Sequence, residues 1–268
     1  MWPTVPVRVT GCAVLLLLLN GSVGATSIVA QVDPDRILFA ADTHGDKLDP
    51  DSKSSNETEC KIVPLGNAAF ALTGNMDYVR HQLNDPIASW DSRSDAREAY
   101  TEQSGDLVAT ANDWATRAKR HYSSFYLANP ARVKQLAKAN DQNILLVGMF
   151  VGFQGGKALL LFEFVYLDEH GLQPILRKQL VLPARKLPYS SNGITQDLID
   201  GHSERAKSAE AAWLKKSSSI PFSTRAFRRL EFVIQVTAKY DETVGTRVNV
   251  LEIFPHEGPR WLQNFTCQ

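Results

Sequence analysis

The residues that could do chemistry begin with Thr26. Residues 1–25 read as a secretory signal peptide, because Arg8 precedes an apolar run, Ala13–Leu19, and the small residues Val23–Ala25 fit a signal-peptidase site. A cut at the end of that stretch would make Thr26 the N-terminus, with a nucleophilic hydroxyl and a basic amine on one residue. A terminal amine has an ordinary pKa of about 8, so a fraction of it is neutral at pH 7 and can accept the hydroxyl proton.

Two charged side chains fall on core-facing rows of predicted strands. Asp42 shares a face with Ala40, and Lys61 shares a face with Val63. An inward lysine needs an acidic partner, so we expect Lys61 to pair with Asp42. Beside Thr26, this ammonium would favour the alkoxide-like state of the hydroxyl. The alternative makes Lys61 a surface residue at a strand start and Asp42 a turn residue.

Composition excludes several classes of partner. The chain has 29 basic and 29 acidic side chains, and loss of Arg8 with the leader leaves 28 against 29. This balance gives no electrostatic case for nucleic acid or an anionic membrane. Beyond the leader no stretch reaches the ~20 apolar residues of a membrane span, so we expect no membrane association after cleavage. A lipoprotein is an alternative, because Val9–Cys12 resembles a lipobox, although it precedes the apolar run.

The histidine and cysteine patterns predict no metal and no cofactor. The six histidines are scattered, and neither an HExxH nor a CxxC motif occurs. Two cysteines would remain after cleavage, Cys60 and Cys267. In an oxidising compartment they can pair, and we expect this disulfide; the alternative is a buried thiol at Cys60 and a free thiol at the tail.

Apolar patterning predicts strands followed by helices, then strands, helices and a strand. The expected strands are 26–32, 37–43, 61–65, 68–73, 144–151, 158–167, 173–182 and 248–254, the last of which closes the domain. The expected helices are 75–139, interrupted near 91–95 and at 129–130, then 208–216 and 224–239. Residues 44–59 read as a polar loop.

Two of these strands, 144–151 and 158–167, are apolar almost without alternation. Strands of this kind are covered on both faces. We therefore expect a middle layer, with a second sheet on one side and helices on the other. This predicts an α+β chain with a four-layer α/β/β/α sandwich of two antiparallel sheets. Residues 26–268 would form one domain behind the signal peptide.

Four segments carry a resemblance to a known family. They are Thr26–Val29, Ala40–Thr43, Cys60–Ile62 and Ala71–Asp77. Together they resemble the N-terminal nucleophile (Ntn) hydrolases, in the branch that contains proteasome β subunits and bacterial HslV. The resemblance is good over residues 26–78 and weaker afterwards, although the order of elements continues to agree.

The resemblance implies roles for particular residues. Thr26 would be the nucleophile, Asp42 and Lys61 would tune it, and a backbone N–H of the Thr73–Gly74 turn would form the oxyanion hole. A family serine falls on Ser190 or Ser191. A family aspartate falls on Asp241, whereas Thr243 or no residue replaces the serine that accompanies it.

Three departures from the family are visible. Thr73 stands where a glycine is usual, Pro64 lies inside a predicted strand and would break one ladder bond, and the loop before Lys61 is long. A signal peptide also stands where the family has a self-cleaved propeptide.

These observations predict a secreted or periplasmic threonine-type hydrolase of peptides or amides. Assembly into a homo-oligomer stays open. The alternatives are a catalytically silent relative that serves as an assembly or binding module, and an unrelated secreted binding protein.

Overall fold

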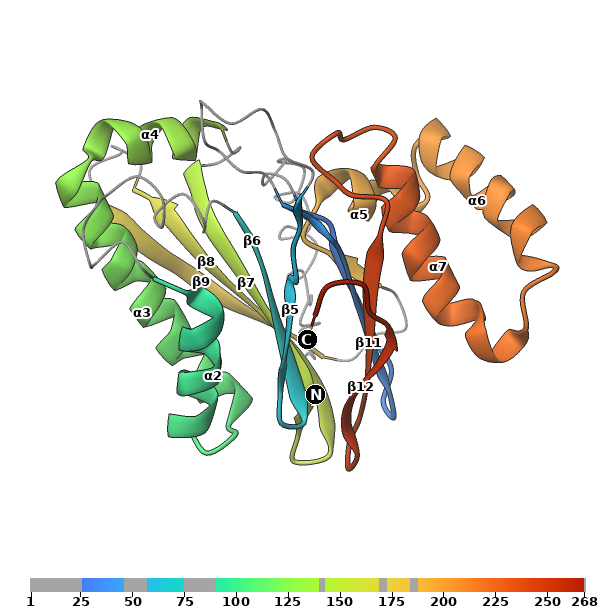
Figure 1. Ribbon diagram of the computed structural model, residues 1–268, viewed down its shortest axis with the longest axis horizontal. Helices are drawn as coiled ribbons and strands as arrows, with labels where there is room; N and C mark the ends of the chain where they lie inside the picture. Colours follow the sequence, from blue (N-terminus) through green and yellow to red (C-terminus); the bar gives the residue numbers. More distant parts are fainter. Residues whose placement is uncertain are drawn as a thin grey trace, which may run out of the picture.

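The computed structural model describes residues 26–45, 57–74, 90–139, 143–168, 173–183 and 188–267, which form two five-stranded antiparallel sheets, a two-stranded ribbon and six helices (Figure 1). The first sheet has the order β10 (Tyr189–Ser190), β1 (Ile28–Val32), β2 (Ile37–Asp42), β11 (Val248–Phe254), β12 (Gly258–Gln263). The second has the order β5 (Ile62–Leu65), β6 (Ala68–Gly74), β7 (Ile144–Gln154), β8 (Lys157–Leu167), β9 (Pro174–Pro183). The ribbon joins β3 (His44–Gly45) to β4 (Glu57–Thr58). The predicted signal peptide lies outside the described residues.

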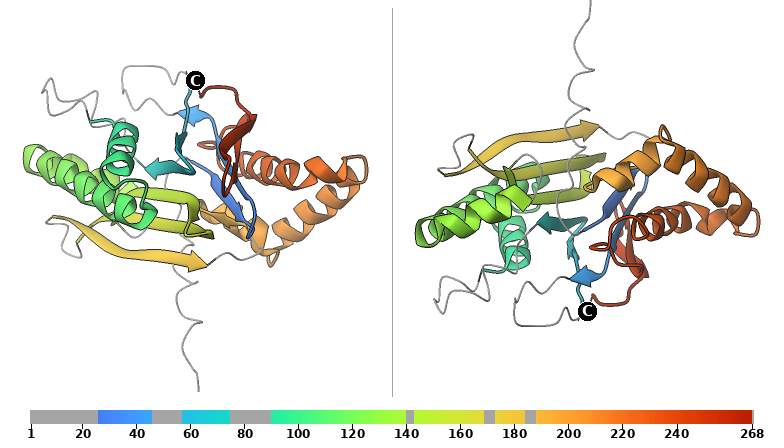
Figure 2. Two further views of the ribbon diagram at one scale, coloured as in Figure 1. Left: turned by 90° about the horizontal axis from the view of Figure 1, so that it is seen from below. Right: turned by 90° about the horizontal axis from the view of Figure 1, so that it is seen from above.

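Helices cover the outer side of each sheet (Figures 1 and 2). Those on the second sheet are α2 (Ser92–Glu102), α3 (Leu107–Ala128) and α4 (Pro130–Ala139). Those beside the first sheet are α5 (Gly193–Asp200), α6 (Glu204–Ser217) and α7 (Phe222–Thr237). Most begin at a side-chain cap: Asp91, Asp106, Asn192 and Ser203 accept from backbone N–H groups of the first turn.

Buried side chains define the layers. Phe39 and Ala41 of β2 meet Met149 and Phe162 of the second sheet in a core between the sheets. On the other face of the second sheet, Phe70, Phe150 and Leu161 pack against α3. A third core joins β2 and β11 to Leu230 and Ile234 of α7. This arrangement of helices, sheet, sheet and helices is consistent with the expected sandwich, and β7 and β8 are covered on both faces as predicted.

Gly148 sets the distance between α3 and the second sheet. A Cβ atom at this position would lie 2.3 Å from the Trp114 ring. Trp114 is fully buried, and its ring lies 5.0 Å from that of Phe70 and 5.5 Å from that of Phe150. The absence of a side chain at Gly148 therefore lets the widest residue of α3 rest directly on β7.

Several predicted boundaries are wrong for local reasons. The domain does not close at β11, because a return strand, β12, adds to the sheet edge, where the missing N–H of Pro259 is tolerated. Helix α5 was not predicted, because it is short and Asn192-Gly193 at its start is typical of a turn. Helix α6 begins at Glu204 rather than at 208, and α7 begins two residues earlier than expected. A break between α2 and α3 contains Gly105, whose φ is +80°.

The expected helix interruptions, the expected helix start at 75 and the position of Pro64 can also be compared with the structure. The interruption expected at 129–130 separates α3 from α4. The interruption expected near 91–95 is wrong for residues 92–95, because α2 begins at Ser92 with Asp91 as its N-cap. The expected helical start at 75 lies outside the described residues. Pro64 is exposed and lies on β5, which is the edge strand of its sheet, so its missing donor costs little.

Candidate active site

Thr26, Asp42 and Lys61 meet where the two sheets join. Thr26 lies two residues before the start of β1, Asp42 ends β2, and Lys61 immediately precedes β5 of the other sheet. The Lys61 Nζ atom donates to Thr26 Oγ1 at 2.9 Å and to Asp42 Oδ2 at 3.0 Å. The ion pair expected between Lys61 and Asp42 is therefore present, and its ammonium touches the threonine hydroxyl. All three side chains are buried: Thr26 is 6% exposed, Asp42 0% and Lys61 7%.

The Asp42 carboxylate accepts four hydrogen bonds, which offset the cost of burying its charge. Oδ1 accepts from the Ser27 N–H at 2.8 Å. Oδ2 accepts from Lys61 and from the N–H groups of His44 at 3.0 Å and Gly245 at 2.9 Å. The Asp42 N–H also donates to the Ser27 carbonyl at 3.1 Å. These reciprocal bonds fix the residue after Thr26 against the end of β2.

Gly245 was not singled out in the sequence. A Cβ atom there would lie 2.9 Å from the His44 backbone nitrogen and 3.4 Å from Asp42 Oδ2. A glycine is needed for its N–H to reach the carboxylate so closely. The sequence signal was weak, since Gly245 is one glycine in a loop 203 residues away from its partner.

A chain of buried hydroxyls supports the segment from the other side. Ser27 Oγ lies 2.7 Å from Thr195 Oγ1, which lies 2.8 Å from Thr237 Oγ1. Thr237 in turn donates to the Val233 carbonyl at 3.0 Å. Helices α5 and α7 are thereby tied to the residue beside Thr26. Sequence reasoning missed these hydrogen-bonded hydroxyls, because single threonines on helices form no recognisable pattern.

Ser190 and Asp241 lie near one another but act on other partners. Ser190 Oγ donates to the Ile28 carbonyl at 2.9 Å and accepts from the Asn192 N–H at 3.1 Å. The Asn192 side-chain amide donates to Asp241 Oδ2 at 3.0 Å. Within the described segments, neither Ser190 nor Asp241 forms a hydrogen bond with Thr26. Asn192, which the sequence analysis overlooked, connects the two.

The remaining candidates have distinct places. Ser191 Oγ accepts from the Ile28 N–H at 3.3 Å. Thr243 donates to Asp241 through both its N–H and its hydroxyl. Gly74 is the last residue of β6 and pairs with Leu146, so the Thr73–Gly74 step lies in the ladder instead of the expected turn. The next residues of the chain, 75–89, lie outside the described residues.

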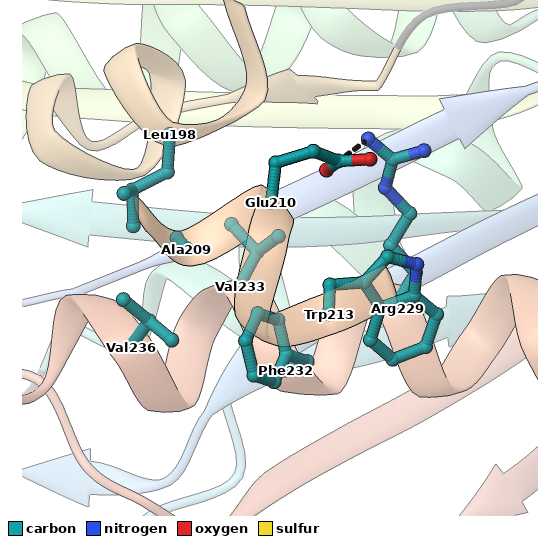
Figure 3. Close-up of a pocket in the computed structure, with 8 residues that line it drawn as sticks. All are labelled: Leu198, Ala209, Glu210, Trp213, Arg229, Phe232, Val233 and Val236. Carbon is teal, nitrogen blue, oxygen red and sulfur yellow. Dashed lines mark hydrogen bonds and ion pairs between the residues drawn. The ribbon is translucent and has the colours of Figure 1, made fainter. Parts of the chain in front are cut away.

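A pocket lies apart from this site, between α5, α6 and α7 (Figure 3). Apolar side chains such as Trp213 and Phe232 line it. The Glu210–Arg229 ion pair, at 3.2 Å, borders it. None of the residues that line it belongs to the Thr26 site, so it does not define a substrate path to Thr26.

The described part of the chain adds two absences. It holds no group of three or more His, Cys, Asp or Glu side chains placed to bind a metal ion. None of its helices combines the length and apolar character that crossing a membrane requires. Comparison with models of known protein families and with curated proteins finds no match for this chain.

Proposed function

We propose that the chain is a threonine-type amide or peptide hydrolase of the Ntn class, in which Thr26 becomes the nucleophile once a signal peptidase removes residues 1–25. The observation that carries the proposal is the single ammonium that touches both Thr26 Oγ1 and Asp42 Oδ2. A surface lysine, or a lysine in a purely structural ion pair, does not need an additional contact to a threonine hydroxyl. The cationic neighbour favours the oxyanion form of that hydroxyl.

The reaction would proceed in two halves. The neutral α-amine of Thr26 accepts the hydroxyl proton while Oγ attacks the substrate carbonyl carbon. The tetrahedral oxyanion would be stabilised by backbone N–H donors near Gly74, and its collapse expels the amine after proton transfer. Water then attacks the resulting ester on Thr26 and releases the acid. Asp42 keeps Lys61 in place throughout and takes no part in the proton transfers.

Two observations support secretion as part of this proposal. Cys60 and Cys267 form a disulfide, which is compatible with an oxidising compartment. The small residues Val23–Ala25 fit a signal-peptidase site, and a cut there would give Thr26 the free amine that the proposed mechanism requires.

A catalytically silent binding module is the second candidate. One observation favours it: Ser190 and Asp241 bond to Ile28 and Asn192 and not to Thr26 in the described residues. In that case the Lys61–Asp42 pair would only hold the two sheets together.

Variants of Thr26 separate the two candidates. In the protein secreted with its leader removed, Thr26→Ala should lower turnover of amide substrates at least about 1000-fold, while Thr26→Ser retains measurable activity because it keeps the hydroxyl. Ser219→Ala, on an exposed turn, serves as the matched control and should leave turnover unchanged. Turnover by Thr26→Ala at the wild-type rate would overturn the assignment of the nucleophile.

A further inference from the structure

Lys61 lies in a short stretch that no sheet ladder holds. Strand β4 ends at Thr58 and β5 begins at Ile62, so residues 59–61 cross between them outside any strand. The ammonium must nevertheless stay within hydrogen-bond distance of two other side chains. The Glu59 N–H donates to the Thr43 carbonyl at 2.8 Å, so the pairing of the ribbon reaches the first residue of this stretch. Other contacts must fix the backbone at Cys60 and Lys61.

Arg93, at the start of α2, holds one side of this stretch. Its Nη1 atom donates to Glu59 Oε1 at 3.0 Å and to the Cys60 carbonyl at 3.3 Å. The Arg93 Nε atom donates to Asp91, the cap of the same helix, at 3.1 Å. The guanidinium is thus oriented by its own helix before it reaches the segment.

The C-terminal turn holds the other side, through a covalent bond. Cys60 and Cys267 form a disulfide with a Cα–Cα distance of 4.8 Å. Thr266 Oγ1 donates to the Glu59 carbonyl at 3.2 Å. The Cys267 N–H donates to Asn264 Oδ1 at 2.7 Å, which closes the turn.

Asn249 anchors this turn to the first sheet. Its Oδ1 atom accepts from the Phe265 N–H at 2.7 Å, and its Nδ2 atom donates to Thr266 Oγ1 at 2.8 Å. Asn249 is 1% exposed and pairs across the ladder with Ala41, while the preceding residue pairs with Asp42. The connection therefore runs from the strand beside Asp42, through the disulfide, to the residue before Lys61.

We propose that the Cys60–Cys267 disulfide is a positioning element for the active site: it joins the sheet that carries Asp42 to the segment that carries Lys61. This inference rests on the proposed hydrolase function. It adds a second covalent event to maturation, since both the cut before Thr26 and the oxidation of the two cysteines complete the site. The chain would then be inactive in a reducing compartment, even with a free Thr26.

The oxidation is a thiol–disulfide exchange with a disulfide reagent, either a small disulfide or a dithiol oxidant protein. Cys60 and Cys267 each lose one proton and one electron as the S–S bond forms. The reagent's disulfide accepts the two electrons and two protons and leaves as two thiols. Reduction by a phosphine reverses the change: phosphorus takes an oxygen from water as it becomes the oxide.

The test compares oxidised and phosphine-reduced protein that begins at Thr26, together with Cys267→Ser. Reduction and the substitution should each lower kcat about 10- to 100-fold and leave KM nearly unchanged, because Lys61 is displaced from Thr26. Oxidised glutathione should restore kcat to the reduced wild type but not to Cys267→Ser. Val133→Ala, a cavity variant in α4, should lower stability without lowering kcat at a temperature where the variant is folded.

A second readout needs no turnover. Acetylation of Lys61 by a limiting amine reagent, followed by peptide mass spectrometry, reports how well its nitrogen is held. We expect acetylation of Lys61 to rise several-fold on reduction, while that of the exposed Lys157 stays constant. If the protein proves to have no hydrolase activity, this readout still decides whether the disulfide holds Lys61.

Unchanged kcat and unchanged Lys61 acetylation in the reduced, folded protein would overturn the proposal. Equal loss of kcat in Val133→Ala would also overturn it, because the effect would then reflect stability alone. Should Cys267→Ser fail to fold, reduction of the folded wild type gives the same comparison, with circular dichroism recorded before and after.

Discussion

At the scale of single residues, the site depends on the buried ion pair between Lys61 and Asp42. Asp42 accepts three backbone N–H bonds in addition to its bond from Lys61. Removal of Lys61 would therefore leave a buried carboxylate that keeps most of its hydrogen bonds but loses its counter-charge. Such an uncompensated charge is costly, although the backbone donors reduce the cost.

We expect Lys61→Met to abolish hydrolysis and to lower the free energy of unfolding by about 3 kcal/mol, the lower end for a broken buried pair. Denaturant unfolding at pH 7 measures the change. Lys157→Met is the matched control: this lysine is exposed at the first position of β8, and its loss should change stability by less than about 0.5 kcal/mol. Equal stabilities of the two variants would contradict the buried pair.

The Lys61–Asp42 pair was predicted from alternation along the strands, but alternation does not explain why the two residues meet. Ala40, on the row assigned to Asp42, lies in the core against α7, whereas Val63, on the row assigned to Lys61, lies in the core against α3. The pair forms because Asp42 ends β2 and Lys61 precedes β5, at the ends of both rows.

The donors of Asp42 could not be predicted in the same way. They are backbone groups, and the Gly245 N–H comes from a loop 203 residues away. Ser190 and Asp241 show a related limit: the resemblance singled out these two residues as candidates, but only the structure shows that Asn192 lies between them.

At the scale of elements, β8 carries a polar group that the proposed reaction does not use. Glu163 is 3% exposed and pairs with Gly148 on the helix-covered face of the sheet. Its Oε1 atom has no hydrogen-bond partner among the described residues. Burial raises the pKa of Glu163 from its usual 4.5 to about 7. The folded state thus binds this proton more tightly than the unfolded state does.

Glu163→Gln should remove a pH dependence of stability. Because the pKa of Glu163 is raised on folding, its destabilising effect is absent below pH 4.5, grows as pH rises and is complete above about 7. The variant should therefore gain up to about 3 kcal/mol over the wild type at pH 8 and nothing at pH 4.5. Melting curves at the two pH values measure this. Glu257→Gln, at an exposed turn, should show no such difference; a gain for Glu163→Gln that is equal at both pH values would contradict the account.

The packing of α3 on β7 gives another prediction. Gly148→Ala places a methyl group within 2.3 Å of the buried Trp114 ring, so we expect a loss of about 1–3 kcal/mol from overpacking. Trp114→Phe should relieve part of this loss, so that the double variant is more stable than the sum of the single effects. Strict additivity in denaturant unfolding would show that the ring and Gly148 are not in contact.

Elements with strong patterns were predictable, and elements defined by tertiary context were not. The continuous apolar runs of β7 and β8 indicated a middle layer, which the two cores on either face of the second sheet bear out. Strand β12 contains Pro259 and partly exposed residues, so neither alternation nor propensity marks it. It forms because it pairs with β11, which would otherwise be the edge strand of the sheet.

At the scale of the whole molecule, the site forms only when both sheets are packed. Asp42 ends β2 of the first sheet and Thr26 leads into β1 of the same sheet, whereas Lys61 leads into β5 of the second. The bonds that complete the arrangement span more than 200 residues, from Asp42 to Gly245 and from Cys60 to Cys267. Activity should therefore be lost together with the global fold. The equal numbers of acidic and basic residues do not predict this arrangement, because composition does not show where the charged side chains lie.

The most direct test of the central claim is the mass of one peptide after treatment with an epoxyketone. Thr26 Oγ can attack the ketone and its free α-amine can open the epoxide, so a ring forms only on an N-terminal threonine. In the secreted protein, we predict that the tryptic peptide Thr26–Arg36 is the N-terminal peptide and carries the reagent, whereas Thr26→Ala carries none. A chain that begins at another residue, or a Thr26 peptide that stays unmodified in the folded protein, would contradict the account.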